Sequence, residues 1–202
     1  MIASYRASEY EHRRALPGDS LIAEPIAVWT QGVTIAAPRA SVWQWVAQLG
    51  SGRAGWYSFD FIDNGGRLSA TKILPEYQRV EVGQIFPALP GATDAFVVAE
   101  IAPEQSLVLT VPAGKNTTIV SWAFLLETQE ESSTRLLVRA KVSHGWIDLA
   151  RNASAGDRIL LINWIYRLLA RLPGFLMIQA GGIGHGIMER RMLRGIKRRA
   201  EK

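Results

Sequence analysis

Five segments of the chain carry the short apolar runs or the alternating pattern of β-strands. They span residues 25–38, 96–101, 106–111, 117–127 and 134–142. Turn-forming residues separate the last four segments at short intervals, as at Pro103-Glu104 and across Gly114–Asn116. Because consecutive antiparallel strands need only short connections, this spacing predicts an antiparallel meander.

Three other segments carry apolar residues at helical spacing. The first opens at Pro38 and Ser41 and ends at Gly50. The second, 157–174, is strongly apolar and is broken at Pro173. The third reaches the C-terminus, and its predicted apolar stripe is formed by Ile187, Met188, Met192, Leu193, Ile196 and Ala200. The resulting order is one strand, short helices, several strands and a long final helix.

The last two predicted strands each have one apolar face. These faces are formed by Val120, Trp122, Phe124 and Leu126, and by Leu136, Val138, Ala140 and Val142. An apolar sheet face must be covered, and the C-terminal third of the chain is the expected cover. Arg139 alternates with the apolar residues of its strand, so its side chain should point away from the covered face.

The segment GSGRAGWY, residues 50–57, contains the G-x-G-x-x-G spacing of dinucleotide-binding loops. That motif needs a strand before the loop and a helix after it, so that the helix N-terminus faces the pyrophosphate. Here a predicted helix precedes the loop, and the next residues end in Asn64-Gly65-Gly66, which allows only a short helical turn. The segment AGGIGHG at 180–186 also lies between helical segments. We therefore expect no dinucleotide and no other cofactor.

A chain of 202 residues with 48% hydrophobic and 20% charged residues is expected to form one globular domain with a substantial core. Because the chain has no cysteine, disulfides and thiolate metal sites are excluded. His12, His144 and His185 are far apart in sequence, so no metal site is predicted.

The N-terminal residues are polar and lack the apolar core of a signal peptide, which favours a cytoplasmic location.

The net charge of +5 comes from the C-terminus, where residues 189–202 hold seven basic and two acidic side chains. Such a segment can bind nucleic acid or an anionic membrane, or it can be the solvated face of a helix. The basic residues alternate with apolar ones, which favours the solvated face, and no nucleic-acid partner is expected. No uncharged run reaches the roughly 18 to 20 residues of a membrane-spanning helix.

Peripheral membrane contact stays open as an alternative. Trp164, Tyr166, Arg167 and Arg171 lie among leucines within 158–178, a pattern typical of helices at a membrane surface. On this hypothesis the protein is a membrane-associated module that docks through 158–178 and the basic C-terminal helix.

Two blocks of the sequence are distinctive, VTIAAPRASVW at 33–43 and GRAGWYSFDFIDNGG at 52–66. Together with SWAFLLE, TRLLVRAKV and the closing IMERRMLRGIKRRAE, they resemble the START-like superfamily, also called SRPBCC, which includes polyketide cyclases and lipid-transport proteins. In particular, they are similar to a bacterial subgroup of that superfamily. The resemblance covers residues 25–142 and 184–201.

The resemblance implies a helix-grip fold of the α+β class, in which a curved antiparallel β-sheet wraps around a long C-terminal helix and encloses a hydrophobic cavity. We expect a polar N-terminal arm at 1–24 and a single START-like domain at 25–202, with an additional apolar helical region at 145–183. The implied function is to bind a hydrophobic small molecule, such as a lipid or a polyketide-like aromatic ring. The alternative is an enzyme of the cyclase or dehydratase kind that uses the same cavity.

The candidate ligand-binding residues are mostly aromatic. They are Arg53, Trp56, Tyr57, Phe59, Tyr77, Trp122 and Phe124. Aromatic rings at a cavity entrance can stack on an apolar ligand, whereas the alternative is that they fill the core. Arg53 can hold a ligand carboxylate by two hydrogen bonds, or it can pair with Asp60 or Asp63.

Asp60 and Asp63 are the candidate catalytic residues. Two residues separate them in an aromatic loop, so they can share a face and act as acid and base. Alternatively, they cap turns, because aspartate readily accepts hydrogen bonds from nearby backbone N–H groups.

Overall fold

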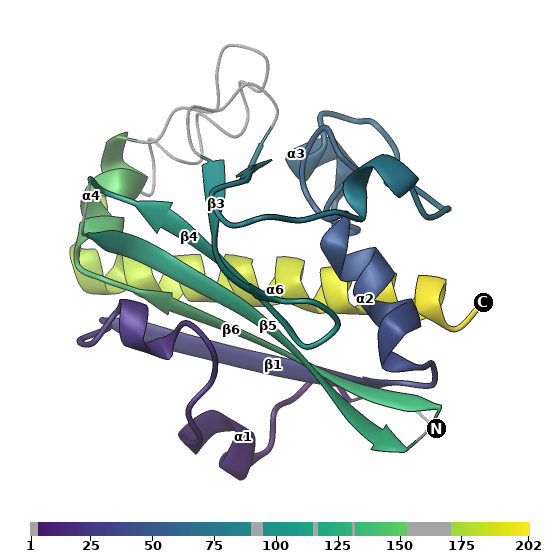
Figure 1. Cartoon of the computed structure of the whole chain (residues 1–202). Coiled ribbons are helices and arrows are strands. Elements are labelled where there is room, and N and C mark those ends of the chain that lie inside the picture. The colour runs from purple at the N-terminus through teal and green to yellow at the C-terminus, as the bar shows by residue number, and fades with distance from the viewer. Residues whose placement is uncertain (1–3, 90–94, 115–116, 131, 153–170) are drawn as a thin grey trace.

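The predicted strands form one antiparallel sheet in the computed structural model, which describes residues 4–89, 95–114, 117–130, 132–152 and 171–202. The strands are β1 (Ala27–Ile35), β2 (Ile85–Pro87), β3 (Ala95–Ala102), β4 (Ser106–Pro112), β5 (Thr118–Glu130) and β6 (Ser133–Val142). The α-helices are α1 (Glu9–Arg13), α2 (Arg39–Ala47), α3 (Asp60–Asp63), α4 (Gly145–Asn152) and α6 (Gly174–Ala200), and the 3-10 turns are η1 (Asp19–Leu21) and η2 (Pro75–Tyr77). The strand order β1-β6-β5-β4-β3-β2 pairs the first strand with the last (Figure 1).

The register of the sheet brings the predicted apolar faces side by side. Trp122 of β5 pairs with Ala140 of β6, and Phe124 pairs with Val138. β1 extends the first of these rows, because Trp29 pairs with the other side of Ala140. Paired residues point to the same side of a sheet, so the rows form one continuous inner face. The predicted sharing of faces is confirmed.

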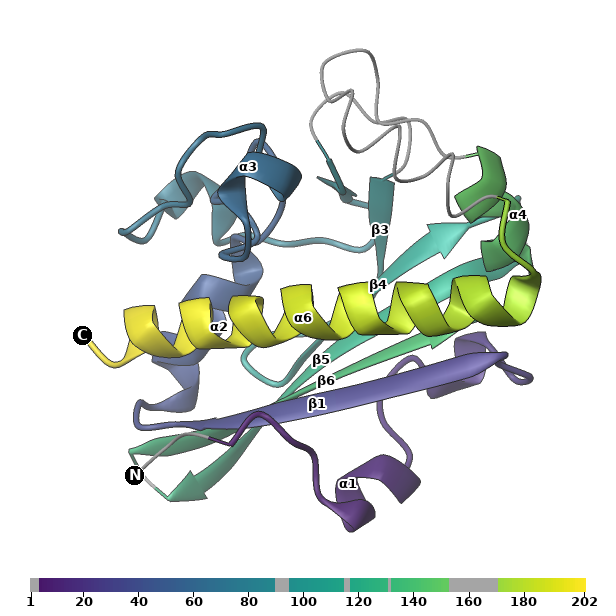
Figure 2. The ribbon, with the colours of Figure 1, turned by 180° about the vertical axis from the view of Figure 1, so that it is seen from behind.

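Helix α6 runs along the inner face of the sheet (Figure 2). Its buried residues are Met177, Glu189, Met192, Leu193, Gly195 and Ile196. The predicted stripe is wrong at Ile187, which is 55% exposed, because the helix turns Glu189 rather than Ile187 toward the sheet. The curved antiparallel sheet and the long C-terminal helix make this an α+β helix-grip fold, as predicted.

The region 145–183 is described only in part. α4 forms its first eight residues, whereas 153–170 lie outside the described residues, and with them most of the predicted helix 157–174. Pro173 is the N-cap of α6, so 174–183 are the first turns of that helix. Within the described ranges, no helix is both long and apolar enough to cross a membrane.

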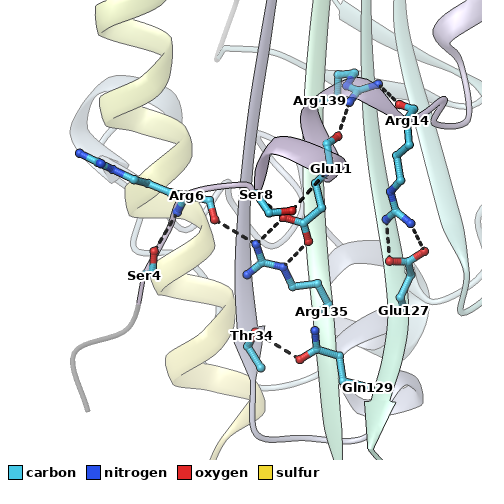
Figure 3. Close-up of polar contacts among 10 residues, drawn as sticks. All are labelled: Ser4, Arg6, Ser8, Glu11, Arg14, Thr34, Glu127, Gln129, Arg135 and Arg139. Atoms are coloured by element: carbon cyan, nitrogen blue, oxygen red, sulfur yellow. Dashed lines mark hydrogen bonds and ion pairs between the residues drawn. The ribbon is translucent and has the colours of Figure 1, made fainter.

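The N-terminal arm covers part of the opposite, outer face of the sheet, where Arg139 anchors it (Figure 3). Arg139 points away from the inner face, as predicted, yet it is only 4% exposed. Its Nη1 donates to Asp19 at 2.7 Å and to the Arg14 carbonyl at 2.9 Å, and its Nη2 donates to the Glu11 carbonyl at 2.6 Å. One buried guanidinium therefore holds α1 and η1 against β6.

Arg135 of β6 makes a second anchor for the arm (Figure 3). It donates to both carboxylate oxygens of Glu11, at 2.8 and 2.9 Å. The same carboxylate accepts a hydrogen bond from the Ser8 backbone and so closes the first turn of α1. Hydrogen bonding to Arg135 lowers the pKa of Glu11 to about 2. The stability that this contact contributes is present above the ordinary pKa of 4.5 and is lost as the pH falls toward 2.

We expect Arg139→Met to lower the free energy of unfolding by about 3 kcal/mol, because Asp19 and several carbonyls lose their buried donor. Arg13→Met is the matched control, since Arg13 makes only an exposed pair with Glu9. Its expected effect is within about 0.5 kcal/mol. Urea unfolding at pH 7 measures both, and equal losses would contradict the anchoring role of Arg139.

Candidate functional site

The glycine loop after α2 turns the chain back on itself. Gly50, Gly52 and Gly55 all have positive φ angles, 124°, 73° and 83°, and Gly50 pairs with Gly55 in an isolated bridge. Glycine adopts these angles without the steric penalty of a Cβ atom. Helix α2 precedes the loop and the next helix, α3, has four residues. The loop therefore lacks the strand and the long helix of a dinucleotide site.

Arg53 closes the C-terminal end of α2. Its Nε donates to the Leu49 carbonyl at 2.8 Å and its Nη2 to the Ala47 carbonyl at 2.9 Å. The guanidinium carbon also lies 4.6 Å from the ring centroid of Tyr77 and 4.1 Å from that of Phe86. In the described part of the chain Arg53 makes no ion pair. Arg53 and Tyr77 thus lie together, with the donors of Arg53 used by the helix end.

Asp60 and Asp63 both hold turns of the loop around α3. Asp60 accepts hydrogen bonds from the backbone N–H of Ser69, at 3.1 Å, and from its hydroxyl. Asp63 accepts from the Phe59 N–H at 3.2 Å. Asp63 is 2% exposed, and burial, with a contribution from the nearby Asp60 carboxylate, raises its pKa to about 6.

Three of the predicted aromatic residues meet on the inner face of the sheet. The ring centroids of Trp122 and Phe124 are 4.9 Å apart, and those of Trp122 and Trp56 are 5.3 Å apart. Phe96 of β3 contacts both tryptophans, at 5.3 and 5.7 Å. Trp56 donates its indole N–H to the Ala88 carbonyl at 3.0 Å, which fixes its ring at the edge of the cluster. The sequence analysis predicted Trp56, Trp122 and Phe124 as ligand-binding residues, and in the fold Trp122 contacts the other two.

Helix α6 adds a buried carboxylate to this aromatic cluster. Glu189 is 2% exposed, and its Oε1 accepts a hydrogen bond from the indole N–H of Trp122 at 3.1 Å. His185 lies one helical turn earlier, with its Nε2 3.2 Å from the same oxygen. The His185 ring also packs against Trp29, at 5.3 Å, and against Trp122, at 5.9 Å.

Three buried polar atoms of α6 and the strand β1 beside it have no hydrogen-bond partner among the described residues. They are Glu189 Oε2, His185 Nε2 and Gln31 Oε1. The His185–Glu189 contact is short enough for an ion pair but lacks the angles of a hydrogen bond. Gln31 is held in place because its Nε2 donates to the Gly186 carbonyl at 3.0 Å. We call Gln31, Trp122, His185 and Glu189 the Glu189 site.

An unpartnered buried polar group costs about 1–3 kcal/mol. The Glu189 site places two acceptor oxygens and an imidazole beside aromatic rings. A bound molecule with a hydrogen-bond donor can satisfy these oxygens while its apolar part contacts the rings. Within the described ranges, no three histidine, aspartate or glutamate side chains group closely enough to hold a metal ion.

The glycines of AGGIGHG accommodate tryptophan rings. A Cβ on Gly182 would lie 2.8 Å from the Trp29 indole nitrogen, and a Cβ on Gly181 would lie 2.5 Å from the Trp146 ring. By contrast, Gly184 faces open space. The two indoles therefore lie directly against the backbone of α6, and Trp29 in turn supports the His185 ring.

The sequence analysis did not identify Glu189 or Gln31, and it considered His185 only as a metal ligand. One signal was available for Glu189, because it precedes Met192, Leu193 and Ile196 at the i+3, i+4 and i+7 spacing of a buried helix face. An acidic residue in that phase predicts a buried carboxylate.

The other two predicted ligand residues, Tyr57 and Phe59, line a groove on the outer side of α6, and Asp60 lines it too. Tyr57 is 4% exposed, and its hydroxyl accepts a hydrogen bond from Gln48 at 2.8 Å. Burial raises the pKa of Tyr57 above its ordinary value. The fold thus divides the predicted residues among the end of α2, the inner face and this outer groove.

Comparison with known proteins gives similarity at the level of structure. No family model matches the sequence, and no curated protein matches it. A protein from Chromobacterium violaceum has 11% identity and a TM-score of 0.47 over 87% of this chain and 97% of its own. A polyketide-cyclase-like protein from Corynebacterium glutamicum has 20% identity and a TM-score of 0.40 over 85% and 89%.

The Zhui aromatase/cyclase from Streptomyces sp. R1128 has 14% identity and a TM-score of 0.44 over 87% of this chain and 93% of its own. Two of these neighbours are a polyketide-cyclase-like protein and an aromatase/cyclase, and the resemblance in sequence is to a superfamily that includes polyketide cyclases. Identities and scores of this size concern the general fold and carry no information about ligand or reaction.

We expect Asp63→Asn to stabilise the protein at neutral pH by on the order of 1–2 kcal/mol. Between the ordinary pKa of 3.8 and the raised value of about 6, the unfolded chain ionises Asp63 while the folded protein keeps it protonated. The wild type therefore loses stability as the pH rises through this range, and the variant does not. Urea unfolding at pH 3.5 and 7.5 measures the difference. A gain from Asp63→Asn that is independent of pH would contradict the assignment.

A pair of glycine substitutions tests the packing of Trp29. We expect Gly182→Ala to destabilise the protein by about 1–3 kcal/mol, because the new methyl group displaces the indole ring. Gly184→Ala is the matched control in the same helix, and it should stabilise by about 0.5–1 kcal/mol because alanine favours the helix. Thermal unfolding compares the two variants, and a gain in both would show that Trp29 does not contact α6 closely.

Proposed function

We propose that the protein binds a hydrophobic small molecule between the inner face of the sheet and α6, with a hydroxyl group of the ligand at the Glu189 site. One observation carries the proposal: Glu189 Oε2 is a buried carboxylate oxygen that receives no hydrogen bond from the described residues. A ligand hydroxyl would donate to it in an apolar surrounding, where such bonds to charged groups are strong.

The surroundings of Glu189 define the class of ligand. Gln31 Oε1 supplies a second acceptor, so a ligand that offers one or two donors matches the site. Trp56, Trp122 and Phe124 offer ring faces and edges for a flat apolar body. A hydroxylated aromatic molecule of the polyketide kind fits both requirements, and a lipid with a hydroxyl head group is the second choice. The enclosed cavity that the resemblance implies is part of this proposal.

The test compares two probes that differ in one group, 2-naphthol and 2-methylnaphthalene. We expect the wild type to bind 2-naphthol more tightly, as measured by quenching of tryptophan fluorescence. Glu189→Gln should weaken 2-naphthol about tenfold, because it replaces the free acceptor by an amide N–H₂ while it keeps an oxygen for Trp122. The affinity for 2-methylnaphthalene should not change.

The matched control is Glu9→Gln, which removes a carboxylate from the exposed pair on α1. Its affinity for both probes should equal that of the wild type. Equal binding of the two probes by the wild type, or an equal loss in both variants, would contradict the role of Glu189. Native mass spectrometry of the purified protein adds a search for lipids that co-purify.

A second candidate function is favoured by the His185–Glu189 contact. An imidazole and a carboxylate 3.2 Å apart in an apolar surrounding are suited to moving protons, as a cyclase or dehydratase requires. Asp60 and Asp63, by contrast, are used in turns. For an enzyme, incubation with a 1,5-diketone such as 2,6-heptanedione should give the cyclised enone and one water by NMR, because proton transfer at the enolisable carbon lets it attack the far carbonyl. His185→Asn should abolish the product, whereas it should weaken 2-naphthol binding less than Glu189→Gln does.

A further inference from the structure

The groove on the outer side of α6 has a volume of about 430 Å³ and lies between the C-terminal half of this helix and the loop that contains Tyr57 to Ser69. Five of its lining residues are arginines of α6: Arg190, Arg191, Arg194, Arg198 and Arg199. None of the residues of the Glu189 site lines it. The groove is therefore separate from the ligand site proposed above.

Two of the arginines are held in fixed positions. Arg191 donates from its Nε to the Ser58 carbonyl at 2.8 Å, and its guanidinium carbon lies 4.4 Å from the ring centroid of Phe59. Arg199 donates from its Nε to a loop carbonyl at 2.8 Å, and it lies 4.4 Å from the ring centroid of Tyr57. Guanidinium groups fixed in this way bind an anion with little further loss of conformational entropy.

Gly195 explains why the loop lies so close to the helix. A Cβ at this position would collide with the carbonyl oxygen and the Cβ of Tyr57, so only glycine lets the loop rest on the backbone of α6. The same close approach makes the groove a concave wall rather than an open helix face.

The charge of the groove is strongly unbalanced. Arg190, Arg194 and Arg198 are exposed and make no ion pair within the described residues. Asp60 is the one acidic residue of the lining, and it already accepts two hydrogen bonds from Ser69. Five positive charges thus face one negative charge, and an anion would relieve their mutual repulsion.

We propose that this groove binds phosphate groups, as a second site independent of the hydrophobic ligand. Several guanidinium forks around one concavity match the many oxygens of a phosphomonoester or a pyrophosphate better than the two of a single carboxylate. The volume exceeds that of a lone phosphate, and Phe59 and Ile187 supply an apolar wall for the rest of the molecule.

Isothermal titration of the full chain with inorganic pyrophosphate tests the site at low ionic strength. We expect the wild type to bind, and the Arg194→Gln/Arg198→Gln variant to bind about tenfold more weakly or worse. The matched control is Arg13→Gln/Arg79→Gln, which removes two exposed positive charges elsewhere. The control variant should bind like the wild type, and sulfate at equal ionic strength should bind more weakly than pyrophosphate.

A second arm separates free phosphate compounds from lipid head groups. Phosphatidylcholine vesicles with and without phosphatidic acid are sedimented with the same three proteins. Binding to phosphatidic acid that pyrophosphate competes away, and that Arg194→Gln/Arg198→Gln abolishes, would assign the groove to a head group. Pyrophosphate binding without sedimentation would assign it to a soluble phosphate compound.

Three results would overturn the proposal. The first is no binding of the wild type to either pyrophosphate or the phosphatidic acid vesicles. The second is an equal loss in the two double variants, which would reflect net charge alone. The third is binding of single-stranded RNA without any binding of pyrophosphate, which would make the arginines a nucleic-acid surface. None of these results depends on Glu189 or on 2-naphthol, so the proposed function stands or fails separately.

Discussion

A buried carboxylate is costly unless both of its oxygens receive hydrogen bonds, and within the described structure Glu189 receives one, from Trp122. The helix-grip arrangement forces this situation, because α6 must lie against the inner face and its phase turns Glu189 inward together with Met192 and Ile196. The Trp122 indole of β5 donates a hydrogen bond to Glu189, and His185 lies beside the same carboxylate, one helical turn earlier on α6. The other acceptor oxygen, Glu189 Oε2, is the observation on which the proposed ligand site rests.

The two faces of α6 differ in polarity and charge. Its buried side carries Glu189 among aromatic rings, and its outer side carries five arginines along a groove. Glycines permit both arrangements, since Gly182 admits the Trp29 ring and Gly195 admits the loop at Tyr57. On the outer face of the sheet, Arg139 of β6 fastens the N-terminal arm, and its Nε also donates to Thr30 of β1, the strand that contacts α6. Helix α6 thus presents the buried surroundings of Glu189 and the arginine-lined groove on different sides.

Local patterns predicted the parts of the fold that depend on periodicity, such as the β5 and β6 faces and the order of elements. The shared face of Trp122 and Phe124 follows from alternation alone. The hydrogen-bond partners of polar side chains could not be predicted in this way, because they come from segments distant in sequence. Arg53 donates to the Tyr77 carbonyl, 24 residues later, and Arg139 is buried because an arm 120 residues earlier covers it. Glu189 was missed because the stripe was drawn through Ile187, which the helix phase leaves exposed.

The indole N–H resonances in a ¹H–¹⁵N NMR spectrum test the central claim most directly, since the Trp122 N–H donates to the Glu189 carboxylate itself. Trp122→Phe assigns the resonance. Saturating 2-naphthol should shift the Trp122 signal, because a second donor to the carboxylate weakens the bond from the indole, whereas the Trp43 signal, from a buried ring on α2, should move less. A Trp122 signal that stays in place at saturation would show that the ligand hydroxyl does not reach Glu189.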